Sequence, residues 1–258
     1  MRDRTDRVAQ FERLVYFHRN YHGFTGGHLK VFGLFHPCRY RQRIQGGDLL
    51  PPQSIWAEHN PWVHSRDRIL LEWHPQQADI MFLAGLDWLS IGEAERDHFS
   101  RPIINLVQHV RHSDPQDPRC AFLGHRAIRI CVSPEVATAL CATGRVNGPI
   151  FTIPIGLHLS VFPEPVPRAT RPYDLVIAGL KAPLLANALA GALKVQRPEL
   201  RLLSLTGWIP RLAFLEALGA ARAALLLPSP NEGFYLPALE AMVMRTIVLC
   251  PDVEGNRG

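Results

Sequence analysis

The sequence is short of the features that mark secreted, zinc-binding and membrane-spanning proteins. Its five cysteines are scattered and form no Cys-x-x-Cys pair. No stretch of about 18 apolar residues occurs, and the N-terminus, MRDRTDRVAQ, has no apolar segment of the kind found in signal peptides. These absences predict a cytoplasmic protein with free thiols, without a disulfide framework and without a metal site.

A strict Gly-x-Gly-x-x-Gly motif is missing too, which argues against a dehydrogenase that binds a nicotinamide or flavin cofactor. What is present is an average globular composition, because 47% of the 258 residues are hydrophobic and 20% are charged. Such a chain can bury a sizeable core, and its length fits one large domain or two smaller ones.

Basic residues are concentrated near the N-terminus. The chain has 28 basic and 23 acidic residues, and residues 1–50 alone hold nine basic against four acidic. This excess favours an anionic partner such as a nucleotide or a phospholipid head group. The cluster Arg39, Tyr40, Arg41, Gln42 and Arg43 fits either a solvated turn or a patch that contacts the inner face of a membrane. No nucleic-acid recognition motif accompanies it, so no nucleic-acid partner is expected.

Short apolar runs alternate with helical patterns through most of the chain, which is typical of a parallel β-sheet covered by helices. A proline-rich connector, which we expect to be stiff and extended, separates two such regions. We therefore expect an α/β protein with two Rossmann-like domains, residues 1–165 and 166–258. The prolines of the connector are Pro163, Pro165, Pro167 and Pro172.

The second pattern stops at Gly258 without a closing helix, so we expect the second domain to be incomplete. In the first domain, strands are expected over 13–17, 80–84, 103–107, 128–132 and 150–153, with a helical segment over 29–35. In the second domain, strands are expected over 175–178, 202–205, 224–227 and 247–250, with helices over 183–196, 212–222 and 237–244.

The most informative segment is PSPNEGFYLPALEAMVMRTIVLCP, residues 228–251. It contains a turn with Glu232 and Gly233, and a helix in which we expect Pro237 at the first position and Glu240 about one turn further on. The segment resembles the Glu-Gly-Phe-x-Leu-Pro-x-Leu-Glu-Ala stretch of retaining nucleotide-sugar glycosyltransferases with the GT-B fold, glycosyltransferase family 4 in particular. The order of elements resembles that family along the whole chain, and the motif itself is specific.

A helix N-terminus presents unpaired N–H groups and a partial positive charge, so it can hold a diphosphate. Glu240 would accept hydrogen bonds from ribose hydroxyls, and Glu232 from hydroxyls of the sugar beyond the diphosphate. The alternative is that both glutamates are solvated residues of an ordinary strand, turn and helix. The amides expected at the diphosphate are those of Gly233, Phe234, Tyr235 and Leu236.

Three other segments match the family by position. The pair Gly26 and Gly27 corresponds to the family's glycine loop near the donor phosphates and the acceptor, although a plain turn is an alternative. His109 stands where the family has a histidine beside the donor sugar; His112 is its rival, and either could be a structural histidine. Lys181 follows the first strand of the second domain, where the family uses an arginine and a lysine to neutralise the leaving diphosphate.

The chain departs from the family at two points. No arginine accompanies Lys181, so the second cation would come from elsewhere, for example Arg211 or Arg257. Lys181 could also be a lone surface lysine. Arg245 stands where the family favours a small residue, usually glycine.

The resemblance implies transfer of a sugar from a nucleotide diphosphate sugar to a hydroxyl of a glycan, lipid or small-molecule acceptor, with retention at the anomeric carbon. Glu232, His109 and Lys181 are then the catalytic candidates. No Asp-x-Asp motif occurs, so we expect an enzyme without metal or cofactor, in which the helix N-terminus and Lys181 meet the leaving-group charge. Two alternatives stay open: a nucleotide-sugar epimerase of the same fold, and a noncatalytic module that binds a nucleotide sugar.

Overall fold

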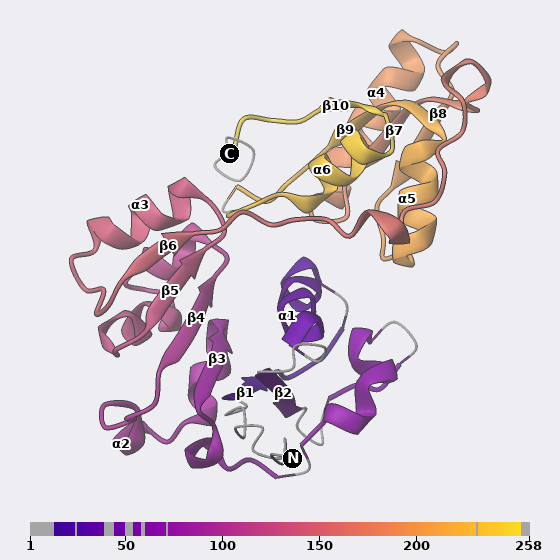
Figure 1. Ribbon diagram of the computed structural model, residues 1–258. Coiled ribbons are helices and arrows are strands. Elements are labelled where there is room, and N and C mark those ends of the chain that lie inside the picture. The colour runs from indigo at the N-terminus through magenta and orange to yellow at the C-terminus, as the bar shows by residue number, and fades with distance from the viewer. Residues whose placement is uncertain are drawn as a thin grey trace, which may run out of the picture. The chain divides into compact units, whose positions relative to one another are not determined.

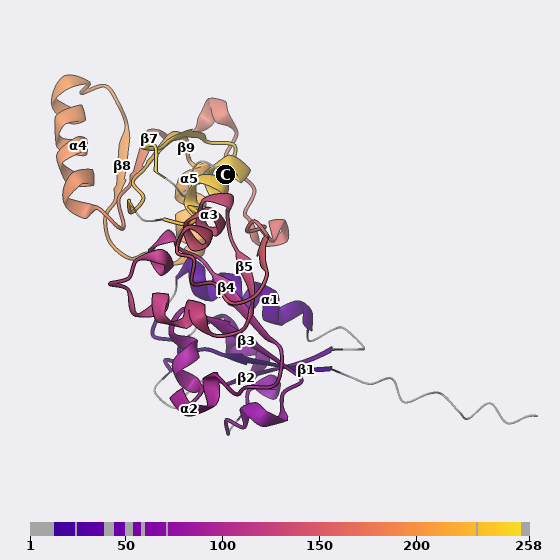
Figure 2. The ribbon, with the colours of Figure 1, turned by 90° about the vertical axis from the view of Figure 1, so that its left-hand side faces the viewer.

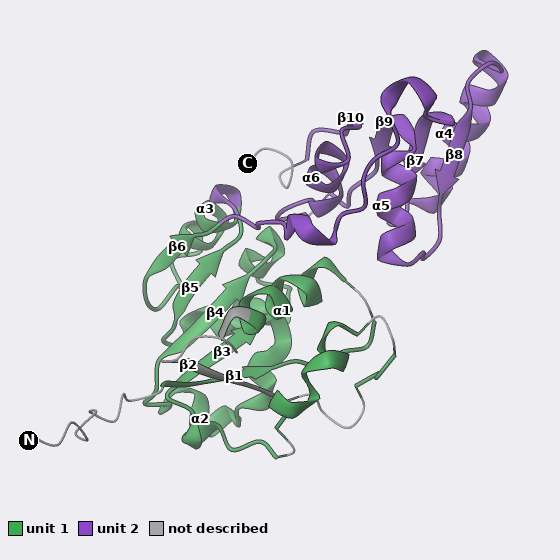
Figure 3. Cartoon of the chain, turned by 45° about the vertical axis from the view of Figure 1, so that its right-hand side comes forward, with its two compact units in different colours: residues 1–132, 136–153 green, residues 133–135, 154–258 purple. Residues whose placement is uncertain are grey.

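The computed structural model describes residues 13–23, 25–38, 44–49, 54–57, 60–70, 72–230 and 232–253. The chain divides into two compact units, coloured separately in Figure 3. Unit 1 comprises residues 1–132 and 136–153, and unit 2 comprises residues 133–135 and 154–258. Each unit is built on a parallel β-sheet, as the alternating apolar runs predict.

The sheet of unit 1 has the strand order β2-β1-β3-β4-β5-β6, and every described neighbouring pair is parallel (Figure 1). Parallel strands that are covered on both faces read as continuous apolar runs, and β3 (IMFLA) has this character, with four of its five residues buried. The strands are β1 (Arg13–His18), β2 (Ile44–Leu49), β3 (Ile80–Ala84), β4 (Ile103–Val107), β5 (Ile128–Cys131) and β6 (Ile150–Thr152).

The helices that accompany this sheet are short apart from α1. Trp62 of η1 is fully buried and packs edge-on against Phe32 of α1, with ring centroids 5.3 Å apart, so η1 is held against α1. The α-helices are α1 (Gly26–Cys38), α2 (Glu93–Arg96) and α3 (Pro134–Ala142). The 3₁₀ helices are η1 (Pro61–Arg68), η2 (Pro75–Gln77), η3 (Gly85–Ser90), η4 (Val110–Ser113) and η5 (Pro118–Gly124).

The sheet of unit 2 has the order β10-β9-β7-β8, again with parallel neighbours. Helix α4 packs beside β8, as Figures 1 and 2 both show. The strands are β7 (Tyr173–Ala178), β8 (Leu202–Leu205), β9 (Ala221–Leu226) and β10 (Ile247–Leu249). The helices are α4 (Pro183–Gln196), α5 (Arg211–Gly219) and α6 (Leu236–Val243), preceded by the 3₁₀ turns η6 (Leu159–Val161) and η7 (Arg168–Thr170).

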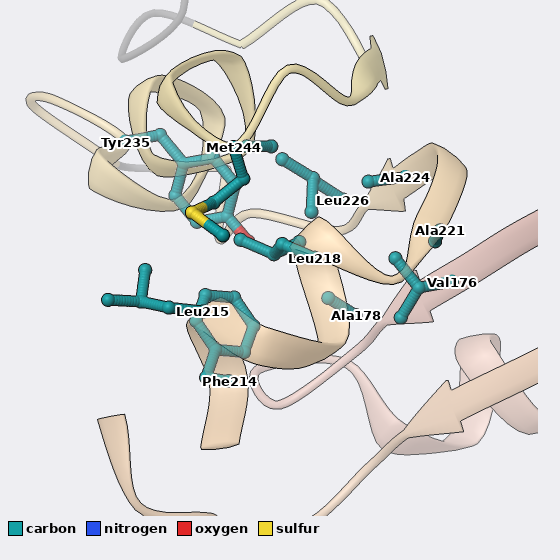
Figure 4. Close-up of a cluster of buried hydrophobic side chains, with 11 residues drawn as sticks. Val176, Ala178, Phe214, Leu215, Leu218, Ala221, Ala224, Leu226, Tyr235 and Met244 are labelled. Carbon is teal, nitrogen blue, oxygen red and sulfur yellow. The ribbon is translucent and has the colours of Figure 1, made fainter. Parts of the chain in front are cut away.

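A cluster of buried side chains fixes α6 against α5 and the sheet (Figure 4). Tyr235, at the start of α6, and Met244, just after its end, both belong to this cluster together with Leu218 of α5. A Cβ at Gly219 would lie 2.5 Å from the Met244 Cε, so the Met244 side chain packs closely over this glycine and would have to shift if a larger residue stood there. Both ends of α6 are therefore anchored in the core, which fixes the position of its N-terminus.

The buried guanidinium of Arg171 ties the end of α6 to the rest of unit 2. It donates to the carbonyls of Val166, Ala221 and Met244 at 3.0, 2.5 and 3.0 Å, and to the Thr246 hydroxyl at 3.0 Å. A cation that donates to carbonyls at a helix C-terminus is also favoured by the helix dipole. Arg171 thus joins the connector, the start of β9 and the last turn of α6.

Most of the expected elements are confirmed, and the bounds of α4 and β8 are those expected from the sequence. The expected helix over 212–222 is wrong at its C-terminal end, because Ala220 caps α5 and β9 begins at Ala221. Strand β2 was not expected, because its sequence, IQGGDL, contains two glycines and no apolar run. Among the described residues, no helix is long and apolar enough to cross a membrane.

Candidate functional site

The glutamate-containing turn lies at the carboxyl edge of the unit 2 sheet. Strands β7 and β9 are parallel neighbours that end in register, with Ala178 opposite Leu226, so the loops that follow them emerge side by side. One loop leads through Lys181 to α4, and the other leads through Glu232 to α6. Gly179 begins the first loop, and a Cβ there would lie 2.2 Å from the Ala186 Cβ, so only glycine allows α4 to come this close.

Lys181 and Glu232 form an ion pair in which the Lys181 ammonium donates to Glu232 Oε1. The partners differ in exposure, because the Lys181 side chain is 49% exposed and that of Glu232 is 5% exposed. The ammonium also lies 5.7 Å from the centre of the Tyr235 ring, within the range of a cation–π contact. The structure therefore brings two of the three expected catalytic residues together, with the carboxylate buried and the cation at the surface.

The N-terminus of α6 is the expected diphosphate site. Helix α6 begins at Leu236, so Pro237 takes its second position and not the first. In the part of the chain that the structure describes, no side chain caps this helix, and the N–H groups of Gly233, Phe234 and Leu236 donate to no protein acceptor. Unpaired N–H groups at a helix N-terminus are suited to an anion.

Glu240 lies one turn into α6 and is held in a second ion pair. The Arg211 guanidinium, at the start of α5, donates to Glu240 Oε1. The side chain of Glu240 is 4% exposed and that of Arg211 is 22% exposed. Burial raises the pKa of Glu240, and the charge and hydrogen bond of Arg211 lower it. The solvated-glutamate alternative is therefore wrong for both Glu232 and Glu240, because both carboxylates are buried and paired.

Tyr235 is the N-cap residue of α6 and lies between the two pairs. Burial raises the pKa of its hydroxyl, and negative charge at Cys250, Glu232 and Glu240 raises it further. Its ring is part of the buried cluster of unit 2 (Figure 4). Tyr235 is thus a neutral, rigid wall of the site.

In unit 1, Gly26 and Gly27 belong to the first turn of α1 and not to the loop before it. Thr25 precedes them, and its hydroxyl accepts from the His28 N–H at 3.2 Å, so Thr25 caps the helix. A Cβ at Gly27 would lie 3.5 Å from the side-chain amide of Gln108, which follows β4. The glycine pair and the segment that carries His109 therefore meet at the carboxyl edge of this sheet.

The two candidate histidines have different environments. His109 is half-buried at the start of η4. His112 is buried, and burial, together with the charges of Arg119 and His109, lowers its pKa to about 3. His112 is therefore a neutral structural residue, which leaves His109 as the better candidate.

Sequence reasoning missed a polar network after β1. Arg19 donates from Nε to His28 Nδ1 at 3.1 Å and from a terminal nitrogen to Asp87 Oδ2 at 2.8 Å. Burial and the Arg19 charge lower the pKa of His28 to about 4, so this histidine is neutral. The sequence holds one signal for the position of His28. Thr25 stands three residues before it, and a threonine at that spacing is typical of a helix N-cap. The network fixes the start of α1 on the sheet.

No protein-family model matches the sequence, and no curated protein matches it. Solved structures do match. Sucrose-phosphate synthase (tll1590) from Thermosynechococcus elongatus is 14% identical, with a TM-score of 0.65 over 95% of this chain and 83% of that chain. Anabaena Alr3699/HepE in complex with UDP and glucose is 14% identical, with a TM-score of 0.62 over 93% and 81%. α,α-Trehalose 6-phosphate synthase from Burkholderia multivorans is 11% identical, with a TM-score of 0.56 over 95% and 85%.

The chain has the GT-B fold. At these identities the likeness concerns the fold alone, and the chemistry rests on the residues described above. Arg211 and Arg257 were the candidates for a second cation beside Lys181. Arg211 is committed to Glu240, and Arg257 and the cluster over residues 39–43 lie outside the described residues.

Arg245 has a backbone conformation that glycine adopts more easily than any other residue. It has φ 55°, the left-handed region, and it follows the last turn of α6. Its N–H bonds the Met242 carbonyl and the Thr246 N–H bonds the Ala241 carbonyl, both at 2.9 Å, which is the Schellman pattern that closes a helix. Glycine adopts this conformation without strain, which explains the family's preference there.

Metal ligands are not gathered anywhere in the part of the chain that the structure describes, where no group of three or more His, Cys, Asp or Glu side chains could hold an ion.

Proposed function

We propose that this chain binds a nucleotide diphosphate sugar at the start of α6 and transfers the sugar to an acceptor hydroxyl with retention, as glycosyltransferases of family 4 do. The observation that carries the proposal is the joint placement of unpaired N–H groups, the Lys181–Glu232 pair and Glu240 around one helix N-terminus. Each of these groups would contact a different part of the donor: the N–H groups and Lys181 the diphosphate, Glu240 the ribose and Glu232 the sugar. The fold shared with a sucrose-phosphate synthase and with HepE, a protein whose structure holds UDP and glucose, supports the same reading.

In this proposal the N–H groups of Gly233, Phe234, Tyr235 and Leu236 and the Lys181 ammonium hold the diphosphate. Glu240 accepts from the ribose hydroxyls, and Glu232 accepts from hydroxyls of the sugar. Lys181 is half exposed, so it can leave Glu232 for the more highly charged diphosphate, and Glu232 is then available to the sugar.

The chemical step breaks the bond between the anomeric carbon and the leaving phosphate oxygen. The acceptor oxygen forms the new bond on the same face, and its proton passes to a phosphate oxygen. The products are a nucleoside diphosphate and a glycoside. Unit 1 supplies the acceptor-side residues in this proposal, with His109 and the Gly26–Gly27 turn as the candidates. No metal and no cofactor takes part. Acceptors compatible with the basic N-terminal region include glycans, lipids and small molecules, with peripheral membrane contact in the lipid case.

The test is calorimetry with UDP, GDP, ADP and dTDP, followed by product analysis with the matching sugar donors. We expect one nucleoside diphosphate to bind, and the donor to release that nucleotide and an acceptor glycoside of unchanged anomeric configuration. Binding of none of the four contradicts the proposal. An isomerised sugar nucleotide would indicate an epimerase, and binding without turnover over a broad acceptor panel would indicate a binding module.

A further inference from the structure

The Arg211–Glu240 pair joins two helices that are distant in sequence. The residues are 29 positions apart, with Arg211 opening α5 and Glu240 one turn into α6. Glu240 has almost no contact with solvent, so its carboxylate has lost most of its hydration. A carboxylate in such a place stays ionised only if other groups replace the water.

Among the described residues, the charge that acts on Glu240 is that of Arg211, which approaches it from α5. Tyr235, at the start of the same helix, is affected by Glu240 and by Cys250, which follows β10. Glu232, in the turn before α6, has its own partner in Lys181. Arg211 is therefore the cation that offsets the burial of Glu240.

Arg211 occupies a position that does not suit its charge. It is the first residue of α5, where the helix dipole is positive and disfavours a cation. Its guanidinium also lies 5.7 Å above the Phe162 ring, which confines it further. The helix dipole does not stabilise an arginine at this position, and little water reaches it. The hydrogen bond to Glu240 is the contact that stabilises its charge.

We infer that Arg211 is a positioning residue that keeps Glu240 ionised and directs its carboxylate toward the ribose diol of the donor. Arg211 donates to Oε1, and the remaining lone pairs of the carboxylate are free to accept both ribose hydroxyls. A protonated Glu240 would have one acceptor oxygen fewer for the diol. This inference rests on the proposed function, because it assigns a role within the same donor site.

The experiment compares the affinities of UDP and 2′,3′-dideoxy-UDP, or of the same pair on the base that the wild type prefers, between pH 6 and pH 8.5. Both ligands carry the same diphosphate, so their affinity ratio reports only the contacts of the ribose hydroxyls. We expect the wild type to favour the ribose ligand by about 10-fold, since hydrogen bonds to a charged group are strong.

In Arg211→Gln the pKa of Glu240 rises, because the cation that lowers it is gone. The ribose preference should then fall to about 2-fold at pH 6 and recover as pH rises and Glu240 loses its proton, with an overall change of about 5-fold. Glu240→Gln should show the low ratio at every pH. Arg222→Gln removes an exposed arginine that pairs with Asp174 and should behave as the wild type.

An Arg211→Gln protein with the wild-type ratio at every pH overturns the inference. If that variant does not fold, Arg211→Lys decides the question. Lysine keeps a positive charge at this position, so the ratio of Arg211→Lys at pH 6 should stay above that of Glu240→Gln, and a ratio as low as that of Glu240→Gln overturns the inference. If the wild type binds no nucleoside diphosphate, it is the proposed function that fails, which is a distinguishable result.

Discussion

Unit 2 contains two buried carboxylates on either side of the α6 N-terminus, and they differ in the kind of cation that each one has. Glu232 pairs with Lys181, whose side chain is half exposed and flexible. Glu240 pairs with Arg211, which is mostly buried and confined by Phe162. The first cation can move to another partner at little cost, whereas the second is fixed by the packing of α5 on α6.

The difference suggests how the two pairs are used. A partly solvated lysine can exchange a carboxylate for a diphosphate when the donor binds, and it can return after product release. If a buried arginine left its carboxylate, two unpaired charges would remain in a place with little water, which is costly. We therefore treat the Lys181–Glu232 pair as the exchangeable part of the site and the Arg211–Glu240 pair as its permanent frame.

The largest expected effect is on stability and tests this contrast directly. Arg211→Met should lower the free energy of unfolding by about 3 kcal/mol, because it leaves a buried carboxylate without its cation. Lys181→Met also leaves a buried carboxylate without its cation, but the half-exposed ammonium lies where water can take its place and hydrate Glu232, so the loss should be smaller, about 1 kcal/mol. Denaturant titration of both variants measures the two values. Equal losses would remove the distinction between the pairs.

The next effect concerns Glu232 in catalysis. Glu232→Gln keeps the size of the side chain but removes the charge that the proposed function places near the anomeric carbon, where positive charge develops in the transition state. The turnover number kcat should fall about 10- to 150-fold with little change in KM, as expected for a contact made mainly in the transition state. Steady-state kinetics with the identified donor measures this. A pure KM effect would place Glu232 on a part of the donor that does not react.

Glu240→Gln should show the opposite division. In the proposed function Glu240 binds the ribose, which is held equally in the ground state and the transition state, so KM for the donor should rise by about 10-fold while kcat changes little. The variant also leaves the Arg211 guanidinium without its carboxylate, and a lower thermal midpoint should accompany the KM effect. The double variant Glu240→Gln, Arg211→Gln should recover part of that midpoint but not the KM.

These residues also illustrate how far the sequence leads. The family resemblance placed Lys181 and the motif that contains Glu232 at one diphosphate site, and the structure brings their loops together because β7 and β9 are parallel neighbours. The bounds of α4 and β8 followed from proline, apolar runs and helix length. The Arg211–Glu240 pair could not be assigned, because it depends on the register with which α5 packs on α6. That packing is made by buried apolar side chains, among them Leu218 of α5 and Met244 just after α6, and no motif encodes it.

In unit 1 the reason for failure was different. Strand β2 (IQGGDL) has neither an apolar run nor an alternating pattern, and its pairing with β1 supplies what the sequence lacks. Gly26 and Gly27 were expected in a loop, because glycine is a weak helix former. The Thr25 cap and the network of Arg19, His28 and Asp87 place them in a helix nevertheless. Tertiary contacts override local preference at both places.

A smaller effect is expected for Lys181 in ligand binding. Lys181→Ala should weaken binding of the nucleoside diphosphate by about 5-fold, the magnitude of a partly solvated charge contact. Binding of the matching nucleoside monophosphate should change by less than about 2-fold, since a point charge near the far phosphate acts mainly on the extra charge. Calorimetry with both ligands measures the difference. The same loss for both ligands would mean that Lys181 does not contact the far phosphate and serves only in its ion pair with Glu232.

The smallest effect concerns the far end of α6, which belongs to neither pair but supports both glutamates through the helix. Arg245 has a left-handed backbone in the Schellman turn, and an L-residue with a Cβ is strained there by about 1 kcal/mol. Arg245→Gly removes that strain, although glycine also loses more conformational freedom on folding. The exposed side chain lies 3.9 Å from the exposed Glu164, a contact of little energy. We therefore expect a net gain of about 0.5 kcal/mol in the free energy of unfolding. Arg245→Ala is the matched control, because it removes the same side chain but keeps the Cβ, and it should bring no gain. Denaturant titration measures both variants: equal stability of the glycine and alanine variants would mean that the strain at position 245 is no larger than the conformational entropy that glycine loses on folding.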